Sequence, residues 1–245
     1  VLDALIDREP NPKHVAVEVI KRGAWELLDH LITKKVVDVH ETFVNSEGQE
    51  TTLALEALGA GEYDIVKYLI KNGAAVEGVA NESALATGIL GGCFQGRRAV
   101  RHMERVIKAG ASVNAPMGTL SPLAAAVRAV HEGANPKAIK GIIDSLVQQG
   151  ANIGSRDEKG NPALHLALVN ASSRKIAKVL IKAGANTEQL DSRGRTPLHV
   201  AAAVGDTAQF KMIARASPER CFSSHSYTGD TPLHEALASR EVTEK

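Results

Sequence analysis

A nine-residue pattern returns along this chain at a nearly fixed interval, and this repetition constrains the fold more than any other feature. Gly194–Ala202 reads Gly-Arg-Thr-Pro-Leu-His-Val-Ala-Ala, and Gly229–Leu237 reads Gly-Asp-Thr-Pro-Leu-His-Glu-Ala-Leu, 35 residues later. A weaker copy, Gly-Asn-Pro-Ala-Leu-His-Leu-Ala, starts at Gly160, 34 residues before the first. Units this short bury their apolar faces only against their neighbours. The pattern therefore predicts a stack of repeated units rather than one large core.

A second marker, Gly-Ala after an apolar helical pattern, supports the same period. It occurs at Gly73, Gly110, Gly150 and Gly184, with spacings of 37, 40 and 34 residues. The longer spacings indicate insertions in the middle repeats. We place them at 91–96, which is rich in glycine and read as flexible, and at 131–136.

The local residues predict a pair of helices in each unit. Thr196 is a suitable helix N-cap, and Pro197 suits the first helical position, where its missing N–H costs nothing. Ala201 and its neighbours give a buried face on which helices can approach closely, and Gly205 fits the turn that follows. An apolar pattern at helical spacing over 173–183 in the preceding unit predicts the second, outer helix, and a polar finger then leads into the next unit.

These residues resemble the ankyrin repeat, whose pattern is Thr-Pro-Leu-His-x-Ala in a unit of about 33 residues. The resemblance implies an all-α solenoid of paired antiparallel short helices with β-hairpin-like fingers, in about five to six full repeats plus terminal fragments. It implies a single array over 1–245. Its units are 1–10 (partial), 11–45, 46–80, 81–116, 117–156, 157–190, 191–225 and 226–245 (partial).

Composition agrees with stacked short helices and limits the expected compartment and partners. The chain has 36 alanines but only eight Phe, Trp and Tyr residues, where a single core would use more large rings. A net charge of +1 is unlike the strongly basic balance of most nucleic-acid-binding domains. Cys93 and Cys221 lie far apart, which fits a reducing compartment, either cytoplasmic or nuclear. No stretch is long enough to suggest insertion into a membrane. Because the sequence begins at Val1, we expect it to be a piece of a larger protein.

The sequence predicts no catalytic residue, metal site or cofactor. His165, His199 and His234 occupy the same position in successive repeats, about 10 Å apart, which is too far for shared zinc ligation at about 2 Å. The resemblance implies that this histidine forms a local hydrogen bond that fixes the preceding loop. No nucleophile motif or phosphate-binding glycine loop is present.

The charges are distributed unevenly between the expected outer helices and fingers. The outer helices hold 18 basic and 7 acidic residues, whereas the finger segments hold 4 basic and 11 acidic ones. Solvation explains such a basic face, since Lys and Arg cover outer helices readily. The other explanation is a surface that selects partners by the sign of their charge. The outer helices are expected at 24–35, 62–72, 97–109, 136–149, 173–183 and 207–220, and the fingers at 36–52, 74–83, 110–121, 150–163, 184–196 and 221–231.

One basic segment, 97–108, gives an alternative function. Its cations share one face of an amphipathic helix, opposite an apolar face that includes Met103. Such a face can receive an acidic, phosphorylated or nucleic-acid ligand, although the absence of interleaved aromatic residues argues against single-stranded nucleic acid. An ordinary solvated helix face is the other interpretation. The candidate anion-binding residues are Arg97, Arg98, Arg101, Arg105 and Lys108.

The resemblance also implies where a partner binds, because ankyrin arrays use their finger tips and the concave face of the inner helices. We therefore expect a non-catalytic interaction scaffold whose partner is another protein or another domain of the same chain, with nucleic acid a less favoured partner. An enzyme domain outside this sequence is a third, weaker hypothesis. The candidate contact residues are Glu158, Lys159, Asn161, Val169, Asn170, Ser192, Arg193, Arg195, Ala203, Val204, Tyr227, Thr228 and Asp230.

Overall fold

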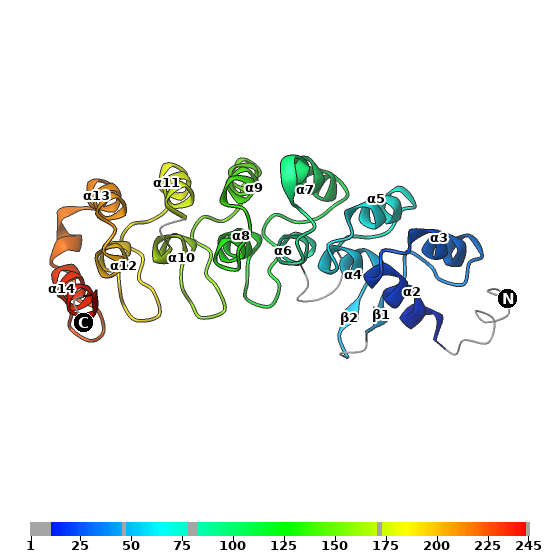
Figure 1. Cartoon of the computed structure of the whole chain (residues 1–245), viewed down its shortest axis with the longest axis horizontal. Helices are drawn as coiled ribbons and strands as arrows, with labels where there is room; N and C mark the ends of the chain where they lie inside the picture. Colours follow the sequence, from blue (N-terminus) through cyan, green and yellow to red (C-terminus); the bar gives the residue numbers. More distant parts are fainter. Residues whose placement is uncertain (1–10, 46–47, 78–82, 171–172, 244–245) are drawn as a thin grey trace. The chain divides into compact units, whose positions relative to one another are not determined.

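The chain folds into two compact units, residues 1–117 and 118–245, in each of which helices stand in pairs (Figure 1). The computed structural model describes residues 11–45, 48–77, 83–170 and 173–243. The predicted partial unit 1–10 lies outside these residues. In the part that the structure describes, no helix is both long and apolar enough to cross a membrane.

Unit 1 contains three successive helix pairs within its described residues. The first helix of each pair is called the inner helix and the second the outer helix. The inner helices pack in a row, as α2 contacts α4 and α4 contacts α6, and each inner helix contacts its own outer helix. The bounds are α2 Pro12–Lys21 with α3 Trp25–Thr33, α4 Leu53–Gly59 with α5 Tyr63–Lys71, and α6 Ala84–Leu90 with α7 Ala99–Lys108, the last preceded by the short helix η1 Gly96–Arg98.

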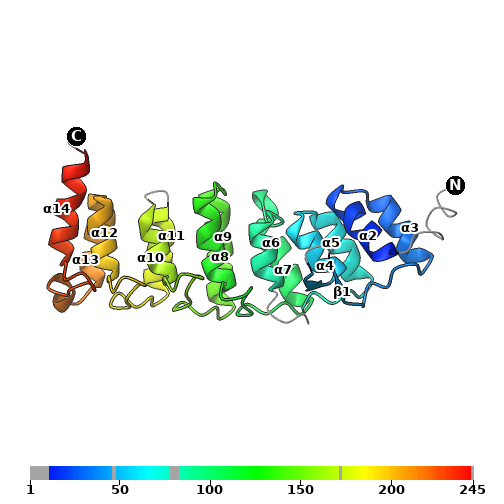
Figure 2. The ribbon, with the colours of Figure 1, turned by 90° about the horizontal axis from the view of Figure 1, so that it is seen from below.

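Unit 2 repeats this arrangement with three further pairs and a final inner helix. Its inner helices follow one another in contact, and so do its outer helices (Figure 2). The bounds are α8 Pro122–His131 with α9 Pro136–Gln148, α10 Ala163–Val169 with α11 Arg174–Lys182, α12 Pro197–Val204 with α13 Thr207–Ala216, then η3 Glu219–Phe222 and α14 Pro232–Thr243.

The signals predicted for the inner helix are confirmed in α12. Thr196 is its N-cap, with Pro197 in the first helical position and a capping box closed by His199. Leu198 and Ala201 are fully buried. Gly205 ends the helix with a φ of 74°, in the left-handed region that glycine adopts readily.

The loops that precede the inner helices, called fingers, differ between the units. In unit 1, β1 (Phe43–Val44) pairs with β2 (Glu50–Thr51) in an antiparallel hairpin, with Phe43 opposite Thr51. In unit 2 the comparable finger contains an isolated antiparallel bridge between Arg156 and Pro162. The expected hairpin-like finger is thus regular in one repeat and reduced to a single bridge in another.

The two expected insertions take forms that the sequence did not predict. The segment 91–96 is not a flexible loop, because Cys93 and Phe94 are 4% and 2% exposed and anchor it to the core. The extra length expected at 131–136 lies largely in the helices. Helix α8 has 10 residues against 7 in α10, and α9 has 13 against 9 in α11.

Candidate functional site

The fingers of unit 2 are fixed by aspartates that accept hydrogen bonds from the backbone. Asp191 Oδ1 accepts from the amides of Arg193 (2.8 Å) and Arg195 (2.9 Å). Asp157 Oδ1 plays the same part in the preceding finger, where it accepts from the Asn161 amide at 2.7 Å. Such side-chain bonds to the following backbone stabilise tight turns. These fingers therefore present their tips in one defined conformation.

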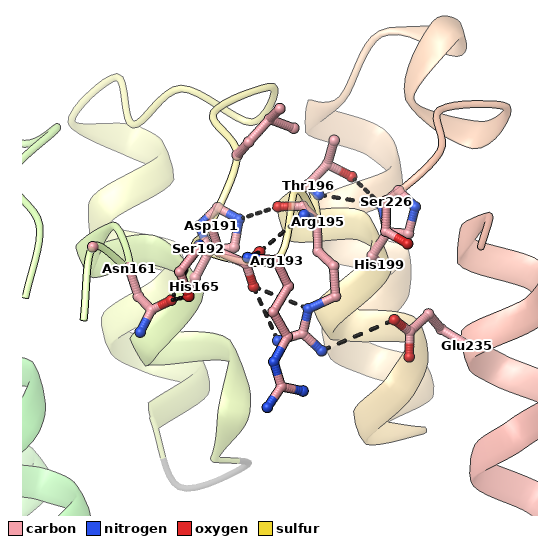
Figure 3. A network of polar contacts seen from close by, with 12 residues as sticks. Asn161, His165, Asp191, Ser192, Arg193, Arg195, Thr196, His199, Ser226 and Glu235 are labelled. Carbon is pink, nitrogen blue, oxygen red and sulfur yellow. Dashed lines mark hydrogen bonds and ion pairs between the residues drawn. The ribbon is translucent and has the colours of Figure 1, made fainter. Parts of the chain in front are cut away.

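The Asp191 carboxylate also holds the side chain of Arg195. The guanidinium of Arg195 lies 2.9 Å from Asp191 Oδ2 and 4.0 Å from Glu235 Oε1 (Figure 3). Burial raises the pKa of Asp191, but the amides and the charge of Arg195 outweigh it, so the pKa lies below its ordinary value. Arg195 is thus committed to an internal network, and only 19% of its side chain is exposed.

In α10 and α12, one histidine of each inner helix bonds to the following finger. His199 Nδ1 accepts from the Thr196 amide at 3.2 Å, and its Nε2 donates to the Asp230 carbonyl at 3.0 Å. His165 Nε2 donates to the Arg195 carbonyl at 2.8 Å. Figure 3 shows these rings in separate repeats. The expected local hydrogen bond to the loop is present at His199 and His234, whereas Nδ1 of His165 has no partner among the described residues. The rings of His165 and His199 both reach the next repeat.

Tyr227 lies directly against the preceding finger. Its amide donates to the Arg193 carbonyl at 3.0 Å. Gly194 has a φ of 73°, and a Cβ there would lie 2.4 Å from Tyr227 Cδ1, so only glycine leaves room for the ring. The ring is still 75% exposed, and it stands beside the exposed Arg193.

The structure exposes most of the predicted contact residues, and their binding role stays a prediction. Val169 and Val204, at the C-terminal ends of α10 and α12, are 56% and 37% exposed. Glu158 Oε1 is exposed and lies 3.5 Å from the guanidinium of Arg128. The exposed members are Glu158, Lys159, Val169, Ser192, Arg193, Val204, Tyr227 and Thr228, and the half-buried ones are Asn161, Asn170, Arg195, Ala203 and Asp230.

The predicted anion-binding face lies on η1 and α7 of unit 1, and all five cations, Arg97, Arg98, Arg101, Arg105 and Lys108, are exposed. The structure adds an aromatic feature that the sequence did not predict. His102 stacks on Tyr63 with ring centroids 3.5 Å apart, and Arg105 donates to the Tyr63 hydroxyl at 3.5 Å. Burial lowers the pKa of His102, and the charges of Arg105 and Arg98 lower it further. This ring is therefore neutral at pH 7.

Two surface grooves between successive outer helices were missed by the sequence reasoning. One, between α3 and α5, is lined by Trp25, Tyr68 and three charged side chains. The other, between α9 and α11, is lined by four lysines over an apolar floor. Their lining residues lie about one repeat apart in the sequence. A comparison of the same helical position in successive outer helices would have identified both grooves.

Metal and disulfide chemistry are not provided by the described residues. No group of three His, Cys, Asp or Glu residues among them is placed to hold a metal ion. Cys93 and Cys221 are both buried and free, and burial raises the pKa of the Cys93 thiol to about 12. Neither thiol is therefore a reactive thiolate at neutral pH.

Comparisons with known proteins agree with this arrangement. Residues 137–220 match the family model described as ankyrin repeats (3 copies). The crystal structure of the human ASB11 ankyrin repeat domain is similar to this chain with a TM-score of 0.69 and 21% sequence identity, covering 94% of this chain and 92% of that chain. A search of curated proteins finds no matching sequence. At this identity the structural match establishes the fold, and it confirms the expected fold class.

Proposed function

We propose that this chain, whose residues 137–220 match the ankyrin-repeat family model and whose fold is that of an ankyrin repeat domain, is a non-catalytic scaffold that binds another protein, or another domain of its own chain, through the fingers and inner helices of unit 2. Ankyrin repeats are typically interaction modules. The observation that carries the proposal is the pairing of Tyr227, 75% exposed, with the exposed Arg193 on a finger whose backbone is held by Asp191. Tyrosine and arginine are enriched at interaction hot spots, and a preformed surface reduces the entropy lost on binding.

Arg193 and Arg195, both predicted contact residues, have different roles in the structure. Arg195 is held by Asp191 and Glu235, so a change there alters the finger itself. The Arg193 side chain is exposed, and its carbonyl and amide keep their backbone contacts whatever the side chain is. Arg193 is therefore the residue that tests binding without disturbing the fold.

The test is a quantitative capture experiment with Arg193→Glu combined with Tyr227→Ser. Proteins captured by the natural chain and lost with this variant are the expected partners. For one such protein, we expect at least about a tenfold loss of affinity by calorimetry, as hot-spot changes give. The matched control is Lys211→Glu on the outer helix α13, which also reverses one exposed charge. Equal capture by the natural chain and both variants would contradict the finger surface.

The alternative function is binding of an acidic or phosphorylated ligand, or of nucleic acid, by the basic face of α7. The observation that favours it is the exposure of all five cations beside the Tyr63–His102 stack, which offers a ring edge next to cationic groups. Arg97→Glu with Arg101→Glu should abolish this binding, and the affinity of the natural chain should fall steeply with salt. A ligand whose affinity ignores salt would contradict it.

We also propose that the partner of the finger surface contacts several repeats of one array extending over 1–245. The finger-to-finger bonds within unit 2 support this, since Ser192 Oγ donates to Asn161 Oδ1 at 3.0 Å and Arg156 donates to the Leu190 carbonyl at 2.9 Å. Neighbouring fingers held in this way present a continuous surface. Removing α14 and its finger by truncation after Ser217 should then weaken binding rather than abolish it.

A further inference from the structure

Unit 2 carries a basic groove on its outer helices, away from the finger tips. The groove lies between α9 and α11, which stand side by side in both views of the ribbon (Figures 1 and 2). It has a volume of about 510 Å³, which is within the range of ligand-binding clefts. Its cationic side chains are Lys140 from α9 and Lys175, Lys178 and Lys182 from α11, and its floor includes Val147 and Val179.

The positive charge of this groove is largely uncompensated. Asp144 is the one carboxylate in the lining, and its Oδ2 is already paired with Lys140 Nζ at 2.5 Å. Among the residues that the structure describes, none forms an ion pair with the three lysines of α11. Arg174, at the start of the same helix, pairs instead with Asp206. Like charges at this helical spacing repel one another, and an anionic ligand would relieve that repulsion.

The three lysines of α11 are spaced to meet a helix. Lys175, Lys178 and Lys182 lie at positions i, i+3 and i+7, which share one face. At a rise of about 1.5 Å per residue they extend along about 10 Å of the helix axis. Carboxylates placed three or four residues apart on a partner helix repeat at the same interval.

The floor of the groove distinguishes this ligand from a simple anion. Val147 and Val179 are half-buried, so an apolar side chain seated between α9 and α11 would remove them further from water. A free phosphate uses only the lysines and gains nothing from the valines. Lysine also suits carboxylates in several orientations, because its ammonium group is a compact charge on a flexible stem.

We propose that the groove between α9 and α11 binds an acidic amphipathic helix of a partner protein, with carboxylates on Lys175, Lys178 and Lys182 and an apolar side chain against Val147 and Val179. This surface is separate from the fingers, so the chain would hold two partners at once or one partner at two places.

The experiment uses the whole chain and a fluorescein-labelled synthetic helix of about 16 residues, long enough to be helical in part. Its glutamates follow the spacing of the α11 lysines, and one leucine lies between them. We expect saturable binding by fluorescence anisotropy, weakening as salt rises. Lys178→Glu with Lys182→Glu should weaken it at least about tenfold. Lys211→Glu with Arg215→Glu on α13 is the control, because it reverses the same number of exposed charges.

Three further measurements decide the nature of the ligand. The peptide with serine in place of leucine should bind about tenfold more weakly, and equal binding would overturn the role of the apolar floor. Tripolyphosphate that displaces the peptide at equimolar concentration would make the groove a general anion site and overturn the proposal. Stronger binding to phosphatidylserine vesicles than to the peptide, lost in the Lys178→Glu, Lys182→Glu variant, would overturn it in favour of a membrane surface.

The outcome is independent of the finger surface. Arg193→Glu with Tyr227→Ser should leave peptide binding unchanged, since neither residue lines the groove. If that variant and the α11 variant weakened the peptide equally, the peptide would be bound elsewhere and the proposal would fail. Loss of capture by the Arg193→Glu, Tyr227→Ser variant with retained peptide binding would support two separate surfaces.

Discussion

The two units build the same helix pairs but connect successive repeats through different side chains. In unit 2, His165 and His199 extend from an inner helix to the carbonyl of the next finger. In α4 and α6 of unit 1 the same helical position holds Leu55 and Ala86, whose side chains have no hydrogen-bonding group, and in α2 it holds the exposed His14. The helices α4 and α6 have simple N-caps, with Thr52 Oγ1 accepting from the Leu55 amide at 3.2 Å, and α8 of unit 2 resembles them, with Ser121 as its cap and Ala124 at this position.

Unit 1 compensates with contacts between its outer helices. Tyr68 of α5 donates to Asp29 of α3 at 2.5 Å, and Tyr63 of α5 stacks on His102 of α7. The hydroxyl of Tyr68 has its pKa raised to about 12 by burial and by Asp29. The comparison shows that one helical-pair architecture accepts different links between repeats. It also predicts that the fingers of unit 2 are the more rigid ones.

The largest expected effect is on Leu198, the fully buried inner residue of α12. Leu198→Asp places a charge in the core and should cost about 4 kcal/mol or more, unfolding the C-terminal repeats first. Circular dichroism should show a partial loss of helix while the fluorescence of Trp25, the one tryptophan and a residue of unit 1, keeps its native transition.

Leu233 provides the control for that prediction, because it occupies the same position in α14 and is 66% exposed. Leu233→Asp should change the free energy of unfolding by under about 1 kcal/mol. A Trp25 transition that shifts together with the helical signal in Leu198→Asp would show that the repeats unfold as one body, contrary to weak coupling between neighbours.

Acid should destabilise unit 2 through His165. Burial lowers the pKa of His165 from 6.5 to about 4, so the folded state keeps the ring neutral where the unfolded chain binds a proton. The contribution of the neutral His165 ring to the free energy of unfolding is therefore fully present above about pH 6.5. It is lost as the pH falls toward 4, by up to about 3 kcal/mol. Urea unfolding at pH 7, 5.5 and 4.5 measures this. His165→Gln, which can still donate to the Arg195 carbonyl, should flatten the dependence, and an unchanged slope would contradict the assignment.

Replacing His199 by leucine gives α12 the residue that α4 of unit 1 has at this position. His199→Leu keeps an apolar side chain of similar size but leaves the Asp230 carbonyl and the Thr196 amide without the ring. We expect a loss of about 2 kcal/mol, measured by chemical denaturation. His234→Leu should cost less, because His234 is exposed and its ring bonds Thr231 at the surface. Equal losses would show that the link to the next finger adds nothing.

The sequence predicted the features that depend on neighbouring residues. The helix pairs, the Thr196 cap and the turn at Gly205 follow from local conformational preferences, and the periodicity shows which faces are buried. Features that need the stacking of repeats were not predicted. The second partner of Arg195, Glu235, lies 40 residues away in the sequence, and the α9–α11 groove joins residues from two repeats. The extra residues near 131–136 were placed in a loop because periodicity locates helix ends poorly.

The smallest expected effect is a stabilisation at Pro162, which stands where the two following repeats have Thr196 and Thr231. Proline has neither the N–H nor the hydroxyl that Thr196 offers to His199, and the buried Nδ1 of His165 finds no hydrogen-bond partner in the described part of the chain. Pro162→Thr should supply both groups, gaining about 1–2 kcal/mol, while the more flexible unfolded chain returns about 0.4–1 kcal/mol. The net gain of up to about 1.6 kcal/mol is measurable by chemical denaturation at pH 7. Pro162→Ala has the same backbone N–H but no hydroxyl, so it should gain less, and a gain equal to that of threonine would assign the effect to the amide alone.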